Sequence, residues 1–252
     1  MRRLRTEGLG VVFGGLHAVE DVTMDVGDDE IVGLIGPNGA GKTTVFNLLT
    51  NVYIPTSGSI ELMGKATAGE KTYQVARHGI ARTFQNIRLF SDMTVLDNVK
   101  LAMNNQMKYS VFSAMLRLPS YWKEEKRVTE RAMELLGVFD LAENAHDLAR
   151  NLPYGKQRKL EITRALAMEP SVLLLDEPAA GMNPTETMEL MQTIRTVKEN
   201  FRISVLLIEH DMNFVMGICQ RIFVLDYGKV IAVGTPEEIQ NNPQVVAAYL
   251  GA

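Results

Sequence analysis

The chain has 252 residues, of which 46% are hydrophobic and 22% charged, and its formal net charge is −4. This length provides for one large domain or two small ones with a sizeable core, and the acidic balance argues against a general nucleic-acid binder. The single cysteine, Cys219, excludes an intrachain disulfide and a thiolate metal cluster. No apolar run approaches the length of a membrane span, and the first residues, MRRLRTEGLG, lack a signal-peptide apolar region, so a soluble cytoplasmic protein is expected.

The first strong pattern is a strand, a glycine-rich loop and a helix. Residues 30–36, EIVGLIG, predict a buried strand, and residues 42–50, KTTVFNLLT, predict a helix. The side chains of this helix expected to face the core are Val45, Phe46, Leu48 and Leu49. The loop GPNGAGKT fits G-x-x-x-x-G-K-[ST] and lies in the strand-to-helix context that this phosphate-loop pattern requires.

Such a loop predicts a nucleoside triphosphate site. Glycines let the backbone approach a phosphate closely and point N–H groups at it, and the helix start adds the favourable end of its dipole. Lys42 is predicted to reach the β- and γ-phosphates, and the Thr43 hydroxyl to bind Mg²⁺. The candidate ATP-binding residues are Gly36, Pro37, Asn38, Gly39, Ala40, Gly41, Lys42, Thr43 and Thr44. A glycine-rich turn without a ligand is the weaker alternative.

The middle of the chain has a different texture. Residues 54–62, IPTSGSIEL, contain a turn before a short strand, and from about residue 90 to residue 150 the pattern becomes helical and rich in Met, Leu, Lys and Glu. These features predict an α/β core interrupted by a helical insertion. Gln85, in RTFQNIRLF, lies at the junction, where a glutamine taken alone is usually just solvated.

The segment LPYGKQRKLE, residues 152–161, raises a question of charge. A proline and a glycine break the chain before a helical pattern whose basic residues are Lys156, Arg158, Lys159 and Arg164. The start of a helix carries a partial positive charge, so acidic residues are favoured there. The pattern therefore asks for an anion, and nothing within the segment is expected to supply one.

Two continuous apolar runs follow, SVLLLDE at 171–177 and ISVLLIEH at 203–210. Runs without alternation are typical of central parallel strands, and ligands of open α/β sheets lie at the carboxyl ends of such strands. Asp176 suits the Mg²⁺ shell, and Glu177 is predicted to orient or deprotonate the attacking water. His210 is predicted to contact the γ-phosphate. The alternatives are acids that cap the next helix and a histidine that is merely hydrogen-bonded.

The end of the chain predicts two local structures. Residues 221–234, RIFVLDYGKVIAVG, read as a hairpin that turns near Tyr227 and Gly228. Thr235 is an expected N-cap, with Pro236 at the first helical position and Glu238 completing a capping box.

Taken in order, the motifs GPNGAGKTT, Gln85, LPYGKQ, VLLLDEP, AAGMNP and His210 resemble an ABC transporter ATPase subunit over essentially the whole chain. The resemblance implies a P-loop NTPase (RecA-like) α/β core with a small antiparallel β subdomain and an inserted α-helical subdomain. Residues 1–88 and 160–252 would form the core with its β subdomain, and residues 89–159 the helical subdomain that ends in the signature segment. ATP and Mg²⁺ are the implied cofactors.

In such ATPases two subunits pack head to tail around two ATP molecules, so the resemblance answers the question of charge. The signature segment, here Tyr154, Gly155, Lys156 and Gln157, would face the ATP held by the partner subunit. The basic residues could instead be neutralised by Glu161 or solvated. Pro153 departs from the family pattern, because it offers neither a hydroxyl nor an N–H group.

Further roles come from the same resemblance. Glu177, His210, Lys42 and Gln85 would be catalytic, and Gln85 would join Thr43 and Asp176 at the Mg²⁺ ion. Phe13 would stack on adenine, with a core aromatic as the alternative. Asn183 would contact the partner subunit.

The wording FGGLHAV, RTFQNIRLF and LDEPAAGMNP is similar to the ATP-binding subunit of branched-chain amino acid importers, the LivG type. This implies ATP-driven dimerisation and hydrolysis coupled to import through an integral membrane permease, at the cytoplasmic face of the membrane. A periplasmic or extracellular solute-binding protein would be an indirect partner, and no nucleic acid is expected. One alternative is another client, such as lipid or lipopolysaccharide export. A nucleotide-switched binding module is disfavoured, because no N-K-x-D motif follows VLLLDE.

Overall fold

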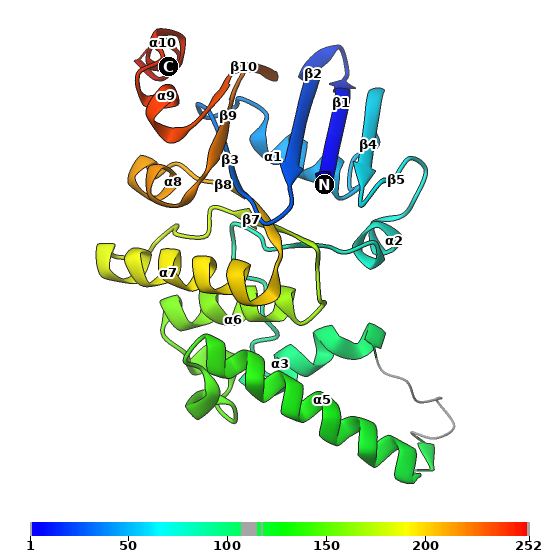
Figure 1. The fold of residues 1–252 in the computed structure, drawn as a ribbon. Helices are drawn as coiled ribbons and strands as arrows, with labels where there is room; N and C mark the ends of the chain where they lie inside the picture. Colours follow the sequence, from blue (N-terminus) through cyan, green and yellow to red (C-terminus); the bar gives the residue numbers. More distant parts are fainter. Residues whose placement is uncertain (1, 107–114, 117, 251–252) are drawn as a thin grey trace. The chain divides into compact units, whose positions relative to one another are not determined.

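A computed structural model describes residues 2–106, 115–116 and 118–250 of the chain. The chain divides into two compact units (Figure 1). The core unit consists of Met1–Gln85 and Pro170–Ala252, and the helical unit consists of Asn86–Glu169. None of the helices in the described ranges has the length and apolar character to cross a membrane.

A four-stranded antiparallel sheet with the order β2-β1-β4-β5 opens the core unit. Its strands are β1 (Arg2–Phe13), β2 (Leu16–Gly27), β4 (Ser57–Leu62) and β5 (Lys65–Ala66). The β1–β2 hairpin turns at Gly14 and Gly15, both at positive φ, which glycine adopts without strain. This sheet is the antiparallel β subdomain that the resemblance implied.

The second sheet has six strands in the order β10-β9-β3-β8-β7-β6. Its strands are β3 (Ile31–Ile35), β6 (Ile80–Arg82), β7 (Val172–Asp176), β8 (Ser204–Ile208), β9 (Arg221–Asp226) and β10 (Lys229–Gly234). All pairs are parallel except β9–β10, which forms the predicted hairpin. Every residue of β3, β7 and β8 is buried, as their unbroken apolar runs predicted.

The helices of the core unit are α1 (Lys42–Leu49), α2 (Thr72–Arg77), α7 (Pro184–Phe201), α8 (Met212–Ile218), α9 (Pro236–Gln240) and α10 (Pro243–Leu250). The predicted start of α9 is confirmed. The Thr235 side chain accepts a hydrogen bond from the Glu238 N–H, and the Glu238 carboxylate accepts one from the Thr235 N–H. Such a cap stabilises a helix start by about 0.5–2 kcal/mol.

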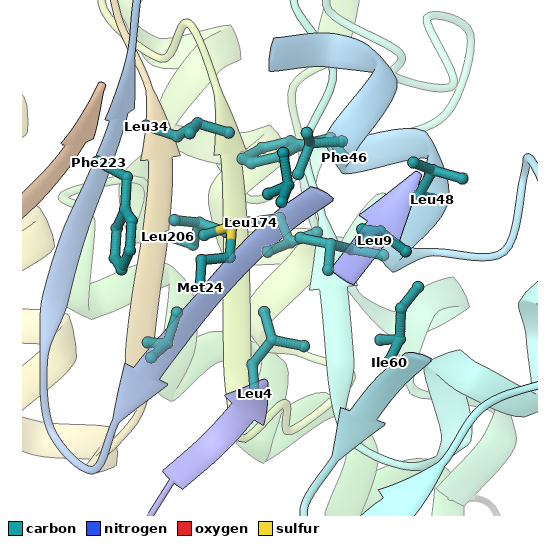
Figure 2. Packing of buried hydrophobic residues seen from close by; sticks show 14 of the residues in the cluster. Leu4, Leu9, Met24, Leu34, Phe46, Leu48, Ile60, Leu174, Leu206 and Phe223 are labelled. Atoms are coloured by element: carbon teal, nitrogen blue, oxygen red, sulfur yellow. The ribbon is translucent and has the colours of Figure 1, made fainter. Parts of the chain in front are cut away.

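The apolar core of this unit lies where the two sheets and α1 meet (Figure 2). Leu174, Leu206 and Phe223 come from the six-stranded sheet, and Leu9 and Met24 come from the antiparallel sheet. The α1 residues predicted to face inward, Val45, Phe46, Leu48 and Leu49, are all buried. Burial on this scale fixes the loop before α1 against both sheets, because close-packed interiors tolerate little displacement.

The helical unit contains α3 (Val95–Ala102), α5 (Pro119–Val138) and α6 (Tyr154–Leu166), with 3₁₀ turns at Met103–Gln106, Ala142–Asn144 and Ala149–Asn151. Helix α3 packs on both α5 and α6. Val128, Ala132, Leu135 and Leu136 form one buried stripe along α5, at the spacing of a helix face. The helical pattern of the sequence from about residue 90 to residue 150 thus predicted this helical insertion.

The expected boundary between residues 159 and 160 falls inside α6, and the compact units instead change between Glu169 and Pro170. An unbroken helix cannot divide between two packed bodies, so all of α6 belongs to the helical unit. At the other boundary the units change after Gln85, slightly before the expected residue 88.

Candidate active site

The loop between β3 and α1 curls around its own lysine. Lys42 Nζ donates hydrogen bonds to the carbonyl oxygens of Gly36 and Pro37, at 2.8 and 2.9 Å. Gly36 has no room for a side chain, because a Cβ there would lie 2.0 Å from the carbonyl oxygen of Leu225. Gly39 has φ +80° and open space where a Cβ would stand. The loop therefore has the close curl and open face that suit a phosphate cradle.

Neighbouring backbone holds this loop in place. Gly228 N–H, in the β9–β10 turn, donates to the Ala40 carbonyl at 2.9 Å, and Glu20 N–H on β2 donates to the Gly228 carbonyl at 2.8 Å. A cleft of about 770 Å³ opens beside the loop and is lined by Gly36–Ala40, His210, Asp226–Tyr227 and Ala247–Tyr249. Its volume lies in the range of small-molecule sites.

The charge of Lys42 is balanced between two effects. Burial lowers the pKa of Lys42, because desolvation disfavours the charged form, and the carboxylates of Glu177 and Asp176 oppose this shift. An additional anion at the loop would favour the ammonium form further.

The Glu177 carboxylate contacts two side chains from other parts of the chain. Its Oε2 accepts a hydrogen bond from Gln85 Nε2 at 2.7 Å, and its Oε1 lies 3.0 Å from His210 Nε2. Glu177 follows the last residue of β7 with φ +48°, a left-handed conformation that costs energy for a residue with a side chain. Its N–H donates to the Ile208 carbonyl on β8 at 2.9 Å. The carboxylate is thus held between two strand ends, where it can orient a water molecule.

Asp176, the last residue of β7, is buried and paired. Its Oδ2 lies 2.8 Å from Nη2 of Arg82, and the Asp176 side chain is only 5% exposed. Thr43, at the start of α1, is exposed. In the described part of the chain no three His, Cys, Asp or Glu side chains gather to hold a metal ion. The donor set fits Mg²⁺, which takes one or two protein ligands together with water and substrate phosphates.

Two of the alternatives for these residues are wrong. Neither Asp176 nor Glu177 caps the next helix, because Asn183 does so, accepting the Glu186 N–H at 3.0 Å in a capping box. Phe13 is not a core aromatic: it is 43% exposed at the end of β1, with its ring centroid 5.1 Å from that of Tyr53. The stacking role of Phe13 and the partner contact of Asn183 remain predictions.

The signature segment forms the first turn of α6 in the helical unit. Tyr154 is exposed, whereas Gly155 is buried within its own chain. Lys156 Nζ donates to Oδ1 of Asn144 at 2.8 Å, and Gln157 Nε2 donates to the Leu152 carbonyl at 2.9 Å. Lys156 and Gln157 are therefore engaged inside their own unit.

The basic start of α6 has an anion within its own segment, so the expectation that the segment supplies none is wrong. Arg158 Nη1 lies 2.8 Å from Oε2 of Glu161, and the two side chains are 0% and 3% exposed. The expectation of solvation is thus wrong for Arg158, and neutralisation by Glu161 is right. Because the pair is sealed from water, Arg158 does not depend on the ATP of another subunit for a counter-ion.

Three residues near the site were not predicted. Arg82 pairs with Asp176, Tyr249 lines the cleft, and Glu209 is buried beside His210. Glu209 accepts the Ala179 N–H at 2.7 Å and the His210 N–H at 3.0 Å, so it ties the chain after β7 to the chain after β8. Its place directly before His210 was a usable signal, whereas Arg82 and Tyr249 needed the tertiary structure.

A phosphate loop at the edge of a parallel sheet, with acids and a histidine at neighbouring strand ends, defines a P-loop ATPase. The family model "ABC transporter" matches residues 19–180, and a second model, "Branched-chain amino acid ATP-binding cassette transporter", matches residues 229–252.

Known proteins are similar to this chain over nearly its whole length. The high-affinity branched-chain amino acid transport ATP-binding protein LivG of Salmonella typhimurium is 49% identical over 98% of this chain and 97% of its own. The lipopolysaccharide export system ATP-binding protein LptB of Haemophilus influenzae is 33% identical over 100% of this chain and 98% of its own. The ADP conformation of the ATP-binding cassette MJ1267 has a TM-score of 0.86 at 29% identity, with 100% of both chains covered. The chain therefore belongs to the ABC transporter family and, within it, to the LivG type of ATP-binding protein.

Proposed function

We propose that this protein is the ATP-hydrolysing subunit of an importer for branched-chain amino acids. One observation carries the catalytic part: Glu177, at the edge that bears the phosphate loop, is held by Gln85 on one oxygen and by His210 on the other. A carboxylate fixed in this way suits general-base or water-orienting work, because its lone pairs are already directed.

The roles follow from position and chemistry. The backbone of Gly36–Thr44 binds the phosphates, Lys42 neutralises the β- and γ-phosphates, and Phe13 packs on the adenine. Thr43, Asp176 and Gln85 would hold Mg²⁺, and the ion would supply positive charge to screen the phosphates. Glu177 orients or deprotonates the attacking water, and His210 stabilises charge that develops on the γ-phosphate.

The working unit is a dimer of ABC ATPase subunits, with either a copy or a related chain as the mate. The phosphate loop lies in the core unit and the signature segment in the helical unit. Each of the two ATP sites combines the phosphate loop of one subunit with the signature segment of the other. Tyr154, exposed at the start of α6, and Asn183 would meet the partner. Pro153 contributes no ligand.

Coupling goes through an integral membrane permease at the cytoplasmic face of the membrane, with a solute-binding protein as an indirect partner and no nucleic acid. The similarity to LivG, 49% against 33% for LptB, supports branched-chain amino acids over lipopolysaccharide as the client. The match of residues 229–252 to the branched-chain amino acid model supports the same client.

The test is steady-state ATPase activity of the purified protein with its co-purified permease. Glu177→Gln and Lys42→Ala should each lower turnover by about 10²-fold or more, and Lys42→Ala should also weaken ATP binding. Glu199→Gln, an exposed glutamate on α7, is the matched control. Wild-type turnover in either active-site variant would remove the assigned roles, and a lipid-export permease in the co-purified complex would remove the assigned client.

A further inference from the structure

Arg82 is buried at a point where three elements of the core unit meet. It is the last residue of β6 and pairs in register with Leu174 on β7. Its Nη2 donates to Oδ2 of Asp176 at 2.8 Å, and its Nη1 donates to Oδ1 of Asn47 at 2.7 Å. The Arg82 side chain is 7% exposed. One guanidinium therefore joins the end of β7 to helix α1.

Two aromatic rings fix the plane of this guanidinium. Its Cζ lies 5.4 Å from the ring centroid of Phe46 and 5.1 Å from that of Phe84. Cation–π contacts and a planar fork of donors restrict an arginine far more than a lysine would be restricted. Nε of Arg82 is nonetheless buried without a hydrogen-bond partner among the described residues. Since an unpaired buried donor lowers stability, packing alone does not account for an arginine here.

Arg82 is linked to the residues proposed to hold the metal ion, directly to Asp176 and to the others through Asn47 and chain position. Asp176 bonds to it directly. Asn47 lies one helical turn after Thr43, so the two share a face of α1. Gln85 follows Arg82 by three positions along the chain. The guanidinium thus sets the position of the Asp176 carboxylate relative to the face of α1 that carries Thr43.

We propose that Arg82 is a positioning residue for the Mg²⁺ site. Arg82 engages Oδ2 of Asp176 in a hydrogen bond, which leaves Oδ1 to face the ion. Its second bond, to Asn47 on α1, fixes the distance between the Asp176 carboxylate and Thr43. This inference rests on the proposed ATPase function. Arg82 would act on the ion indirectly, through the Asp176 carboxylate that it holds and the Asn47 side chain that links it to α1.

The test separates metal affinity from nucleotide affinity. Binding of a fluorescent ATP analogue is measured first with excess EDTA and then in a Mg²⁺ titration, using wild type, Arg82→Met and Arg82→Lys. Residues that orient metal ligands typically change metal affinity by about 10–100-fold. We expect Arg82→Met to raise the Mg²⁺ concentration at half-maximal enhancement by about tenfold or more, with Arg82→Lys in between. The affinity without Mg²⁺ should stay at the wild-type value.

Two further variants keep the test decisive. Arg77→Met, an exposed arginine on α2 stacked on Tyr73 at 5.6 Å, is the matched control and should leave the titration unchanged. Asn47→Ala breaks only the link to α1 and should shift the Mg²⁺ titration in the same direction as Arg82→Met. If Arg82→Met does not fold, the Mg²⁺ titrations of Arg82→Lys and Asn47→Ala decide whether Arg82 positions the metal site.

The outcomes distinguish this inference from the proposed function. An unchanged Mg²⁺ titration in the folded Arg82 and Asn47 variants, beside a normal wild-type enhancement, overturns the positioning role alone. Equal weakening with and without Mg²⁺ also overturns it, because it would show a structural effect on the whole site. The absence of ATP binding in the wild type would overturn the proposed function instead.

Discussion

The Nε2 atom of His210 lies 3.0 Å from Oε1 of Glu177, although the two residues follow different strands of the parallel sheet. His210 therefore fixes the carboxylate that is proposed to orient water. We expect His210→Ala to lower kcat by about 10²–10³-fold, the usual effect of losing one preorganised group. KM for ATP should change little, because the phosphate loop remains intact.

His78→Ala provides the control for this change. His78 also contacts a glutamate, with Nε2 2.9 Å from Oε1 of Glu70, but it belongs to neither the loop nor the strand ends. Steady-state kinetics of both variants would compare two histidine–glutamate contacts, of which only that of His210 lies at the site. A kcat of His210→Ala within about twofold of wild type would show that the contact has no part in turnover.

The ion pair of Arg158 and Glu161 makes a prediction about stability. Removing one member of a buried pair leaves an uncompensated charge, so Arg158→Met and Glu161→Leu should each lower the free energy of unfolding by about 3–5 kcal/mol. The double variant should be less destabilised than the sum of the two, because an apolar pair carries no unpaired charge. Urea denaturation of the four proteins gives the coupling energy.

A matched pair lies on α5 at the same spacing. Arg131 Nη1 is 2.9 Å from Oε2 of Glu134, but the two side chains are 38% and 65% exposed. Removing this pair should cost only about 0–1 kcal/mol. Equal costs for the two pairs would contradict the importance of burial for Arg158 and Glu161.

The contrast between these pairs also marks the limit of sequence reasoning. The phosphate loop, its flanking strand and helix, and the strand ends at Asp176 and His210 were predictable because motif and apolar run are local. The basic start of α6 indicated a missing anion, but whether Arg158 faces water or its own Glu161 depends on packing that spacing does not encode.

Irregular strand register and long-range pairing explain the other omissions. Strands β1 and β2 pair through several register shifts, so no clean alternation marks their residues. Arg82 reads as an ordinary polar residue at the end of a short strand, and it gains its meaning only from Asp176, 94 positions away. The contact between Glu177 and His210 could be expected at the level of strand ends, but its geometry could not.

Glu209 predicts a pH dependence of stability. Burial raises its pKa above the ordinary value of 4.5, and the charge of Glu177 adds to this, although backbone N–H bonds from Ala179, His210 and Asp211 oppose it. The native state therefore binds this proton more tightly than the unfolded state does. The contribution of Glu209 to the free energy of unfolding falls as pH rises from about 4.5 through the raised pKa.

Glu209→Gln removes this titration and keeps a hydrogen-bond acceptor. The variant should gain stability relative to wild type as pH rises from about 5 to about 8. Urea denaturation at several pH values measures the difference, and Glu199→Gln on exposed α7 gives the baseline for losing one carboxylate. A difference that stays constant or falls with pH would contradict the burial effect.

Cys219 gives a test of packing that does not depend on ATP. Its thiol lies 3.1 Å from the position that a Cβ on Gly33 would occupy, against the centre of the parallel sheet, and burial raises its pKa from 9.0 to about 12. Because the thiolate is the reactive form, native protein near neutral pH should react with a disulfide reagent only through opening of the fold. Absorbance should show one thiol per chain reacting at once in urea and slowly without it. A Cys219→Ala, Thr72→Cys protein, with its thiol on exposed α2, should react fast in both conditions. Fast reaction of native wild type would mean that α8 and β3 are not packed as described.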